Sequence, residues 1–263
     1  MKRNAKLLLT LIKMRLSHLM VFRLSFFGAF FVDGSMFLIQ LLLFDVLFGQ
    51  VEAIGGWHKA EMTIFVGTFS LVNALNMSTF FFGLITIPEK IRTGALDLYI
   101  TKPGNPLLRL SFERMDPGSL PLIALSLMII LRGVSLLPMT PSLFAIAGYI
   151  LLVLLMTLLW YDLMLLVRTV PFFVLSAAAV HQMEESLIEL SIKVPGIVFQ
   201  GVWKVIFQFF LPYGLIATMP TQALTGALSP FGLLSGCLVA LVFTFFALRL
   251  WRVGLSRYKS ASS

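Results

Sequence analysis

The feature that most limits how this chain can fold is a run of 44 residues, Val205–Leu248, that contains no Asp, Glu, Lys or Arg. A helix needs roughly 20 apolar residues to cross the hydrocarbon core of a bilayer, so this run holds most of two membrane spans. Composition agrees, because 59% of the 263 residues are apolar and 12% are charged, against about 45–50% and about 25% in soluble domains. We therefore predict an all-α, polytopic membrane protein.

Six transmembrane helices are predicted within a single transmembrane domain, residues 1–263. They follow in pairs, with spans 1 and 2 in 24–87, spans 3 and 4 in 117–167, and spans 5 and 6 in 197–251. The second span is uncharged from Met62 to Ile87, and prolines mark the turn between the third and fourth. One cysteine, Cys237, lies in an apolar run and excludes an internal disulfide framework.

The positions of the basic residues predict the orientation of these spans. The N-terminus, the loop after span 2, Arg168 and the tail together hold 16 of the 20 Lys and Arg. Basic residues beside hydrophobic spans gather on the cytoplasmic side. We expect a multi-pass protein of the cell (inner) membrane with both termini cytoplasmic and 252–263 as a basic tail. The net charge of +8 then indicates a lipid bilayer, not nucleic acid, as its partner.

Residues 1–23 carry six basic residues and no acid. Their apolar residues recur at spacings of three and four, which is typical of one face of a helix: Leu8, Leu11, Ile12, Leu16, Leu19 and Met20. We predict an amphipathic helix on the inner membrane surface. The alternative, a signal peptide, is disfavoured because the basic stretch is too long and no small-residue cleavage site follows it.

The segment 169–194 is more polar than a lipid-facing span, with one His, three Glu and one Lys. Its apolar side favours an amphipathic helix at the inner face, where it would offer a second contact to a partner. The fifth span is then predicted at roughly Ile197–Met219 and the sixth at roughly Phe231–Trp251. Pro212 is expected to kink the fifth span.

A short polar stretch between spans 2 and 3 carries the most specific pattern. It reads Ile91-Arg92-x-Gly94-x-Leu96-Asp97-x-x-x-x-Lys102-Pro103, bracketed by Pro88 and Pro103. Gly94 predicts a turn between two short helices. The pattern resembles the first intracellular loop of type-2, export-type ABC transporter permeases, in a little-characterised bacterial branch. Ala95 and Ile100 replace residues that are usual there, and both keep the local character.

The resemblance implies that residues 88–116 form a cytoplasmic coupling loop, whose coupling helix docks into a separate ATPase. The residues implied in that contact are Glu89, Lys90, Arg92, Gly94, Leu96, Asp97, Lys102 and Pro103. It also implies two ABC ATPase subunits per complex, a second permease of the same or a similar chain, and a broken helical element near Pro212–Pro230. The chain would then have no cofactor of its own, and ATP and Mg would bind the partner ATPase.

Polar residues inside the predicted spans offer a second set of candidates. Asp33 lies deep in the first span, and Asn73 and Asn76 lie in the second. Such groups face a helix neighbour or a watery cavity. Packing or solvation is the simpler interpretation, with Asp33 paired to Arg23 as one form of it. The alternative is a substrate path lined by these three residues.

Three functional hypotheses remain on the sequence alone. The first is the permease subunit of an ATP-driven exporter for an amphipathic small molecule, peptide or lipid. The second is an intramembrane lipid-modifying enzyme that uses Asp33 and Asp162, and the third an ion-coupled secondary transporter. No G-x-x-x-x-G-K-[ST], G-x-S-x-G or H-E-x-x-H occurs in the sequence, so we expect no catalytic or metal site. We see no internal repeat of the kind that secondary transporters show.

Overall fold

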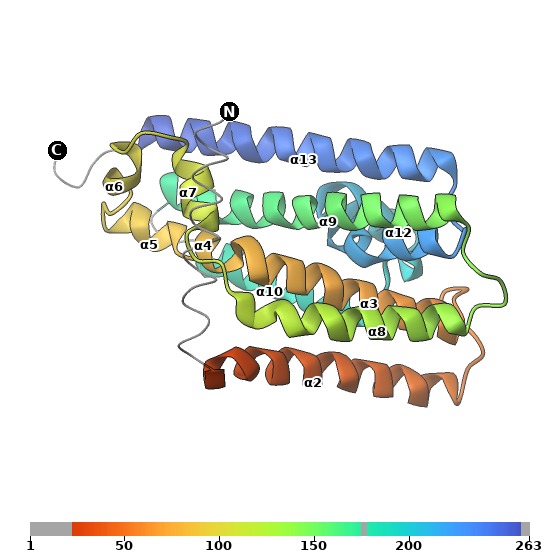
Figure 1. Cartoon of the computed structure of the whole chain (residues 1–263). Helices are drawn as coiled ribbons and strands as arrows, with labels where there is room; N and C mark the ends of the chain where they lie inside the picture. The colour runs from red at the N-terminus through yellow and green to blue at the C-terminus, as the bar shows by residue number, and fades with distance from the viewer. Residues whose placement is uncertain (1–22, 175–177, 259–263) are drawn as a thin grey trace.

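The computed structural model describes residues 23–174 and 178–258 and is shown in Figure 1. The chain is a helical bundle whose five long helices lie along a shared direction: α2 (Arg23–Phe48), α3 (Lys59–Asn76), α8 (Leu120–Ser135), α9 (Leu143–Thr169) and α13 (Pro230–Arg257). The regular elements of the described residues are helices, and an isolated bridge between Ile54 and Trp57 closes the hairpin before α3. The all-α prediction is confirmed.

The bundle has two ends, which we name by a residue or helix at each. The α6 end carries the short helices α5 (Ile87–Arg92), α6 (Asp97–Ile100) and α7 (Pro106–Phe112). The Trp57 end carries the hairpin between α2 and α3 and the turn between α8 and α9. The start of α2 and the end of α13 both lie at the α6 end. This agrees with an even number of membrane crossings between them.

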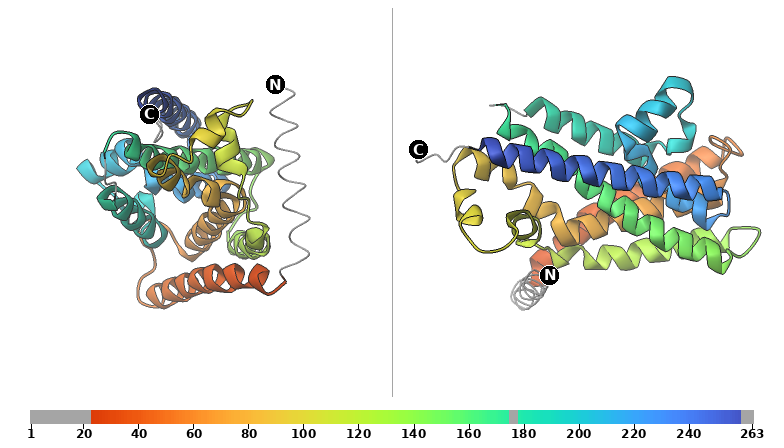
Figure 2. Two further views of the ribbon diagram at one scale, coloured as in Figure 1. Left: turned by 90° about the vertical axis from the view of Figure 1, so that its left-hand side faces the viewer. Right: turned by 90° about the horizontal axis from the view of Figure 1, so that it is seen from above.

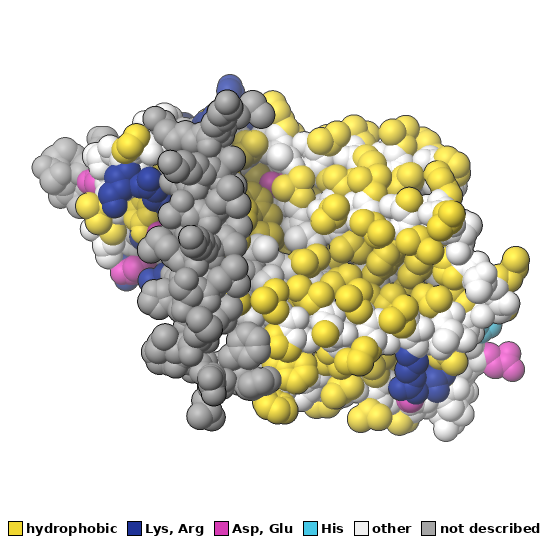
Figure 3. Space-filling model, in the orientation of Figure 1, with side chains coloured by type: hydrophobic (Ala, Val, Ile, Leu, Met, Phe, Trp, Pro, Cys, Tyr) yellow, Lys and Arg dark blue, Asp and Glu magenta, His cyan; other side chains and the backbone are white. Residues whose placement is uncertain are grey.

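The sides of the bundle are apolar. Figure 3 shows hydrophobic side chains over the face between the two ends, with the charged side chains mainly near the ends. On α13, Phe231, Leu234 and Leu238 are all at least 60% exposed and lie on one side of the helix. Five helices are long and apolar enough to cross a membrane, or six if one bent pair counts as a span. The chain is a multi-pass membrane protein.

Helix α3 lies at the centre of the bundle and is buried along most of its length. It packs against α8, where Ser126 Oγ donates a hydrogen bond of 2.7 Å to Ser70 Oγ. Its Thr68 hydroxyl lies 3.1 Å from the Tyr149 hydroxyl of α9. Hydroxyl pairs of this kind hold membrane helices together because lipid offers no competing partner.

The fifth crossing differs from the prediction. Helix α10 (Ala178–Lys193) begins at the α6 end and runs along the bundle towards the Trp57 end instead of lying flat on a surface. The chain then reaches that end, because a Cβ added at Gly55 would lie 3.1 Å from Val198 Cγ2. Helix α10 with Val194–Val198 therefore joins the two ends of the bundle, whereas the sequence pattern predicts that 169–194 lies at the inner face.

The segment predicted as the fifth span, Ile197–Met219, is not one straight helix. Gly201–Phe210 and Pro212–Leu224 form a pair bent by 86°. Its first arm starts near the Trp57 end, and its second, which includes α12 (Leu215–Leu224), returns there, since Gly148 in the first turns of α9 lies against Ala223. Both ends of the pair therefore lie near the Trp57 end of the bundle, and we call the pair the re-entrant element. Pro212 marks the bend, and the broken element expected near Pro212–Pro230 begins earlier, at Gly201.

The predicted amphipathic helix over 1–23 lies almost entirely outside the described residues, as does the end of the 252–263 tail.

Candidate coupling loop and intramembrane polar groups

The turn predicted at Gly94 is present. Helix α5 begins with Pro88 in its first turn and ends at Arg92, and α6 begins at Asp97. Gly94 has a φ of +78°, a left-handed conformation that only glycine adopts without strain. Leu96 N–H donates to the carbonyl of Lys90 over 3.0 Å, which closes the turn. The sequence motif therefore encodes two short helices with a fixed angle between them.

The eight predicted coupling residues fall into three environments. Glu89, Arg92, Lys102 and Pro103 are exposed, whereas Leu96 is fully buried in the core. Gly94 forms the turn, and Lys90 and Asp97 contact other parts of the chain. Their role in docking stays a prediction. The four exposed residues can reach a partner directly, whereas Leu96 anchors the loop to the bundle.

Two exposed apolar residues of the same loop were not among the predictions. Leu98 is 62% exposed and Ile100 is 41% exposed, and both lie on α6. They stand on either side of Tyr99, which points to the interior contacts described below. An alternating pattern in a four-residue helix is too short to predict an exposed face, so this apolar tip could not be predicted from the sequence.

Asp97 connects the loop to the last helix. Burial raises the pKa of the Tyr258 phenol, and the nearby carboxylate of Asp97 raises it further. Tyr258 follows α13, and its ring meets that of Phe172 at 6.0 Å between centroids. The loop therefore touches the end of the last span as well as the spans on either side of it.

The backbones of two elements meet closely beneath the loop. A Cβ added at Gly83, in α4 (Phe82–Leu84), would lie 2.3 Å from the carbonyl oxygens of Leu110 and Ser111 in α7. Any side chain at Gly83 would force the two elements apart. Just before α4, Met77–Phe81 forms a π-helical segment within the second span, and such segments are often found at functional sites.

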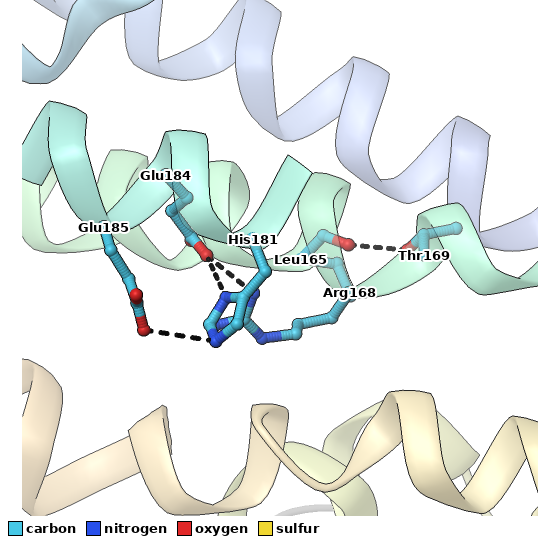
Figure 4. A network of polar contacts seen from close by, with 6 residues as sticks. All are labelled: Leu165, Arg168, Thr169, His181, Glu184 and Glu185. Carbon is cyan, nitrogen blue, oxygen red and sulfur yellow. Dashed lines mark hydrogen bonds and ion pairs between the residues drawn. The ribbon is translucent and has the colours of Figure 1, made fainter. Parts of the chain in front are cut away.

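A charged network inside the bundle joins α9 to α10, and Figure 4 shows it. Arg168 Nη1 donates to Glu184 Oε2 over 2.6 Å and lies 3.0 Å from His181 Nδ1. His181 Nε2 lies 3.3 Å from Glu185 Oε1. The side chains of Arg168 and Glu184 are only 6% and 2% exposed, whereas Glu185 is 67% exposed. Tyr213 of the re-entrant element lies near both members of the buried pair.

This pair explains why a polar helix can pack within the bundle. An unpaired carboxylate in a membrane interior is costly, and a paired one much less so. From the sequence, Arg168 was interpreted only as a marker of the inner side, and Glu184 as part of a polar surface. The sequence did contain a signal for this pair, because a basic residue ends one span and acidic residues occur early in the next segment.

The three residues of the proposed substrate path do not share one environment. Asn76 is 1% exposed and its Oδ1 has no hydrogen-bond partner, while Asn73 is half-buried on the same helix. Asp33 is half-buried on α2 and lies close enough to Asp116 for the two carboxylates to repel each other. Asn76 therefore faces the core, and Asp33 belongs to the junction of α2 with the loop before α8.

A family comparison decides what kind of protein this is. The sequence model of a protein family described as "ABC-2 family transporter protein" matches residues 35–262. The chain belongs to the ABC-2 transporter family. No curated protein and no solved structure matched the chain. As an ABC-2 permease it is a membrane subunit for transport, not itself catalytic, and members of this family generally work with ABC ATPases.

The enzyme hypothesis had rested on Asp33 and Asp162. In the ABC-2 permease Asp162 is fully buried, and Thr244 of α13 donates a 2.5 Å hydrogen bond to its Oδ2. No group of three or more His, Cys, Asp and Glu side chains gathers as a metal site among residues 23–174 and 178–258. The contact observed for Asp162 thus joins α9 to α13.

Proposed function

We propose that the ABC-2 permease is the membrane subunit of an ATP-driven exporter, which moves an amphipathic small molecule, peptide or lipid out of the cytoplasm. A separate ATPase binds the ATP and Mg and supplies the energy. Two ATPases and a second permease, of the same or a similar chain, complete the transporter. The permease lies in the cell membrane with the α6 end and both termini in the cytoplasm.

The observation that carries this proposal is the shape of the α5–α6 loop. A docking element must be short, stiff and exposed so that movement of a partner reaches the spans. The loop is held by Pro88, by the turn at Gly94 and by buried Leu96. It presents Leu98 and Ile100 with charged residues around them. Apolar anchors within a polar rim are typical of protein interfaces.

The exposed face of α10 supports a passage beside a second permease. His181, Glu185, Glu189 and Lys193 recur every four residues, and each side chain is between 48% and 67% exposed. A charge facing lipid at the bilayer centre costs about 2.5–3.5 kcal/mol on insertion scales. This stripe therefore faces water or polar groups of a second permease, and we place the wall of the transport path there.

The experiment is to express the tagged permease in its native host, solubilise the membranes and identify proteins that co-purify. A P-loop ATPase is the expected partner, in equal molar amount. Arg92→Glu should reduce its recovery, because Arg92 is 75% exposed in the loop. The matched control is Lys59→Glu at the Trp57 end, where Lys59 pairs with Asp45 over 3.0 Å. Recovery of the permease without any ATPase would contradict the proposal.

Orientation is tested by labelling single cysteines in intact cells, with Cys237 replaced by Ser. A cysteine at Thr101, on the loop, should react with a membrane-impermeant maleimide only after the cells are opened. A cysteine at exposed Thr140, in the turn between α8 and α9, should react from outside. The reverse result would contradict both the topology and the docking role.

A further inference from the structure

Three short elements of the α6 end converge on one carboxylate, that of Glu113, which directly follows α7. Lys90 of α5 forms an ion pair with Glu113 Oε1. Tyr99 of α6 donates a hydrogen bond of 2.7 Å from its hydroxyl to Glu113 Oε2. The Lys90 Nζ atom also lies 4.4 Å from the centre of the Tyr99 ring. We call Lys90, Tyr99 and Glu113 the Glu113 clamp.

The clamp is sheltered from water, unlike the ion pair between Arg92 and Glu89. The side chains of Lys90 and Glu113 are 13% and 18% exposed, against 75% and 59% for Arg92 and Glu89. Exposed pairs contribute little because solvent and salt screen them. A sheltered, charge-assisted contact is stronger and fixes geometry better. The clamp is therefore a structural joint, and the Arg92–Glu89 pair belongs to the surface.

Tyr99 remains a donor to this carboxylate at any physiological pH. Burial raises the pKa of Tyr99 to about 12, with the hydrogen bond to Glu113 as the next contribution. The neutral phenol keeps its proton, and Glu113 contacts Lys90 through one oxygen and Tyr99 through the other. Losing either partner leaves the other in place but frees one of the two short helices.

The position of Glu113 in the chain links two spans. Helix α5 continues the path of α3 from the core, and Glu113 precedes η2 (Pro117–Ser119), which leads into α8. The clamp thus ties the end of the second span to the start of the third, with α6 held between them. The close backbone contact at Gly83 makes the same connection a second time. A push on α6 must then move both spans together.

We propose that Glu113 is a positioning residue for energy transfer: it holds α6 so that movement of a docked ATPase reaches the second and third spans. This rests on the proposed function, in which the loop docks an ATPase. Glu113 does not itself need to touch the partner. The clamp predicts a class of variant that assembles normally but no longer couples the ATPase to the membrane helices.

The test measures assembly and coupling separately. The permease and its co-purifying ATPase are reconstituted in vesicles of phosphatidylethanolamine and phosphatidylglycerol. Assembly is the molar ratio of the two chains, and coupling is the ATP hydrolysis rate of the complex divided by that of the ATPase alone. Glu113→Gln should keep the ratio and lower the coupling by about 2- to 30-fold, the range of mutations along coupling networks. Tyr99→Phe should have a smaller effect in the same direction.

Two further variants separate positioning from a fold defect. The exchange Lys90→Glu with Glu113→Lys restores the ion pair and should recover part of the coupling that either single reversal loses. Lys59→Met removes an ion pair at the opposite end and should leave coupling unchanged. The melting temperature of each permease is measured beside these.

The outcomes are distinct. If no ATPase binds the wild-type permease, the proposed function fails and this proposal fails with it. If Glu113→Gln retains wild-type coupling, the proposed function stands and the positioning role is overturned. If Glu113→Gln loses the ATPase, or if the charge exchange recovers nothing, Glu113 acts in docking or folding and the proposal is likewise overturned.

Discussion

The loop that contains α5 and α6 and the helix α10 are both rich in charge, yet they lie in different surroundings. In the loop, Arg92 and Glu89 are largely exposed at the end of the bundle. On α10, Glu184 is buried against Arg168, and the remaining charges form an exposed stripe along a helix that follows the spans. The loop and α10 have a similar content of charged residues, but these residues lie at different depths in the bundle.

The comparison teaches that charge count alone does not place a segment in water. Lipid excludes unpaired charges, but a carboxylate that finds a guanidinium within the bundle can remain there. Arg92 and Glu89 of the loop instead pair with each other in an exposed position at the end of the bundle. Helix α10 has a guanidinium partner within the bundle because α9 ends with Arg168 close to the start of α10.

The largest expected effect comes from breaking the buried pair. Glu184→Ala leaves the Arg168 guanidinium buried without its carboxylate and should cost about 3–5 kcal/mol of stability. The readout is unfolding of the purified permease in detergent. Glu185→Ala is the matched control, since Glu185 is the next residue and is 67% exposed, and it should cost less than about 1 kcal/mol. Equal losses of stability in the two variants would contradict the conclusion that Glu184 of α10 is buried while the charges of the loop are exposed.

The next effect tests the turn at Gly94. Gly94→Val places a β-branched residue at a φ of +78° and should strain the loop by about 1–2 kcal/mol. Coupling to the ATPase, measured as above, should fall even where the complex forms. Gly94→Asn is the control because Asn adopts the left-handed region more readily. If both variants couple normally, the stiffness of the loop is not what transmits movement.

Single charges on the exposed part of the loop should matter less. Lys102→Ala should weaken ATPase binding by about 0.2–1 kcal/mol, as expected for an exposed pair. Asp97→Lys should cost more, because Asp97 is half-buried and its carboxylate lies near Tyr258, so the reversed charge also disturbs that contact. Binding of the purified ATPase to the permease in vesicles, measured at two salt concentrations, gives both values. A larger loss of ATPase binding from Lys102→Ala than from Asp97→Lys would contradict this order of effects.

The smallest effect is expected at Asp33. It is half-buried and faces Asp116 rather than a described basic partner, so Asp33→Asn removes a repulsion and leaves the bundle intact. Transport of an amphipathic dye into inverted vesicles should stay within about threefold of wild type, the range of ordinary surface changes. Complete loss of transport by a folded variant would instead place Asp33 in the substrate path.

The sequence by itself determined that the chain lies in a lipid bilayer, that it is helical, where most spans lie and where the loop turns. Uncharged runs of about 20 residues demand lipid, and a glycine between two short polar helices demands a turn. These are local properties, readable from neighbouring residues. The resemblance to ABC transporter permeases supplied the eight predicted coupling residues, of which Glu89, Arg92, Lys102 and Pro103 are exposed.

Only the tertiary structure decided the course of α10, the re-entrant element and the Glu113 clamp. Each depends on residues that are distant in sequence: Arg168 and Glu184 are 16 positions apart, and Lys90 and Glu113 are 23 apart. Periodicity shows which side of a helix is polar, but not which partner that side will meet. The free energy of a buried charge is set by that partner, so the packing of the whole bundle fixed what the local pattern left open.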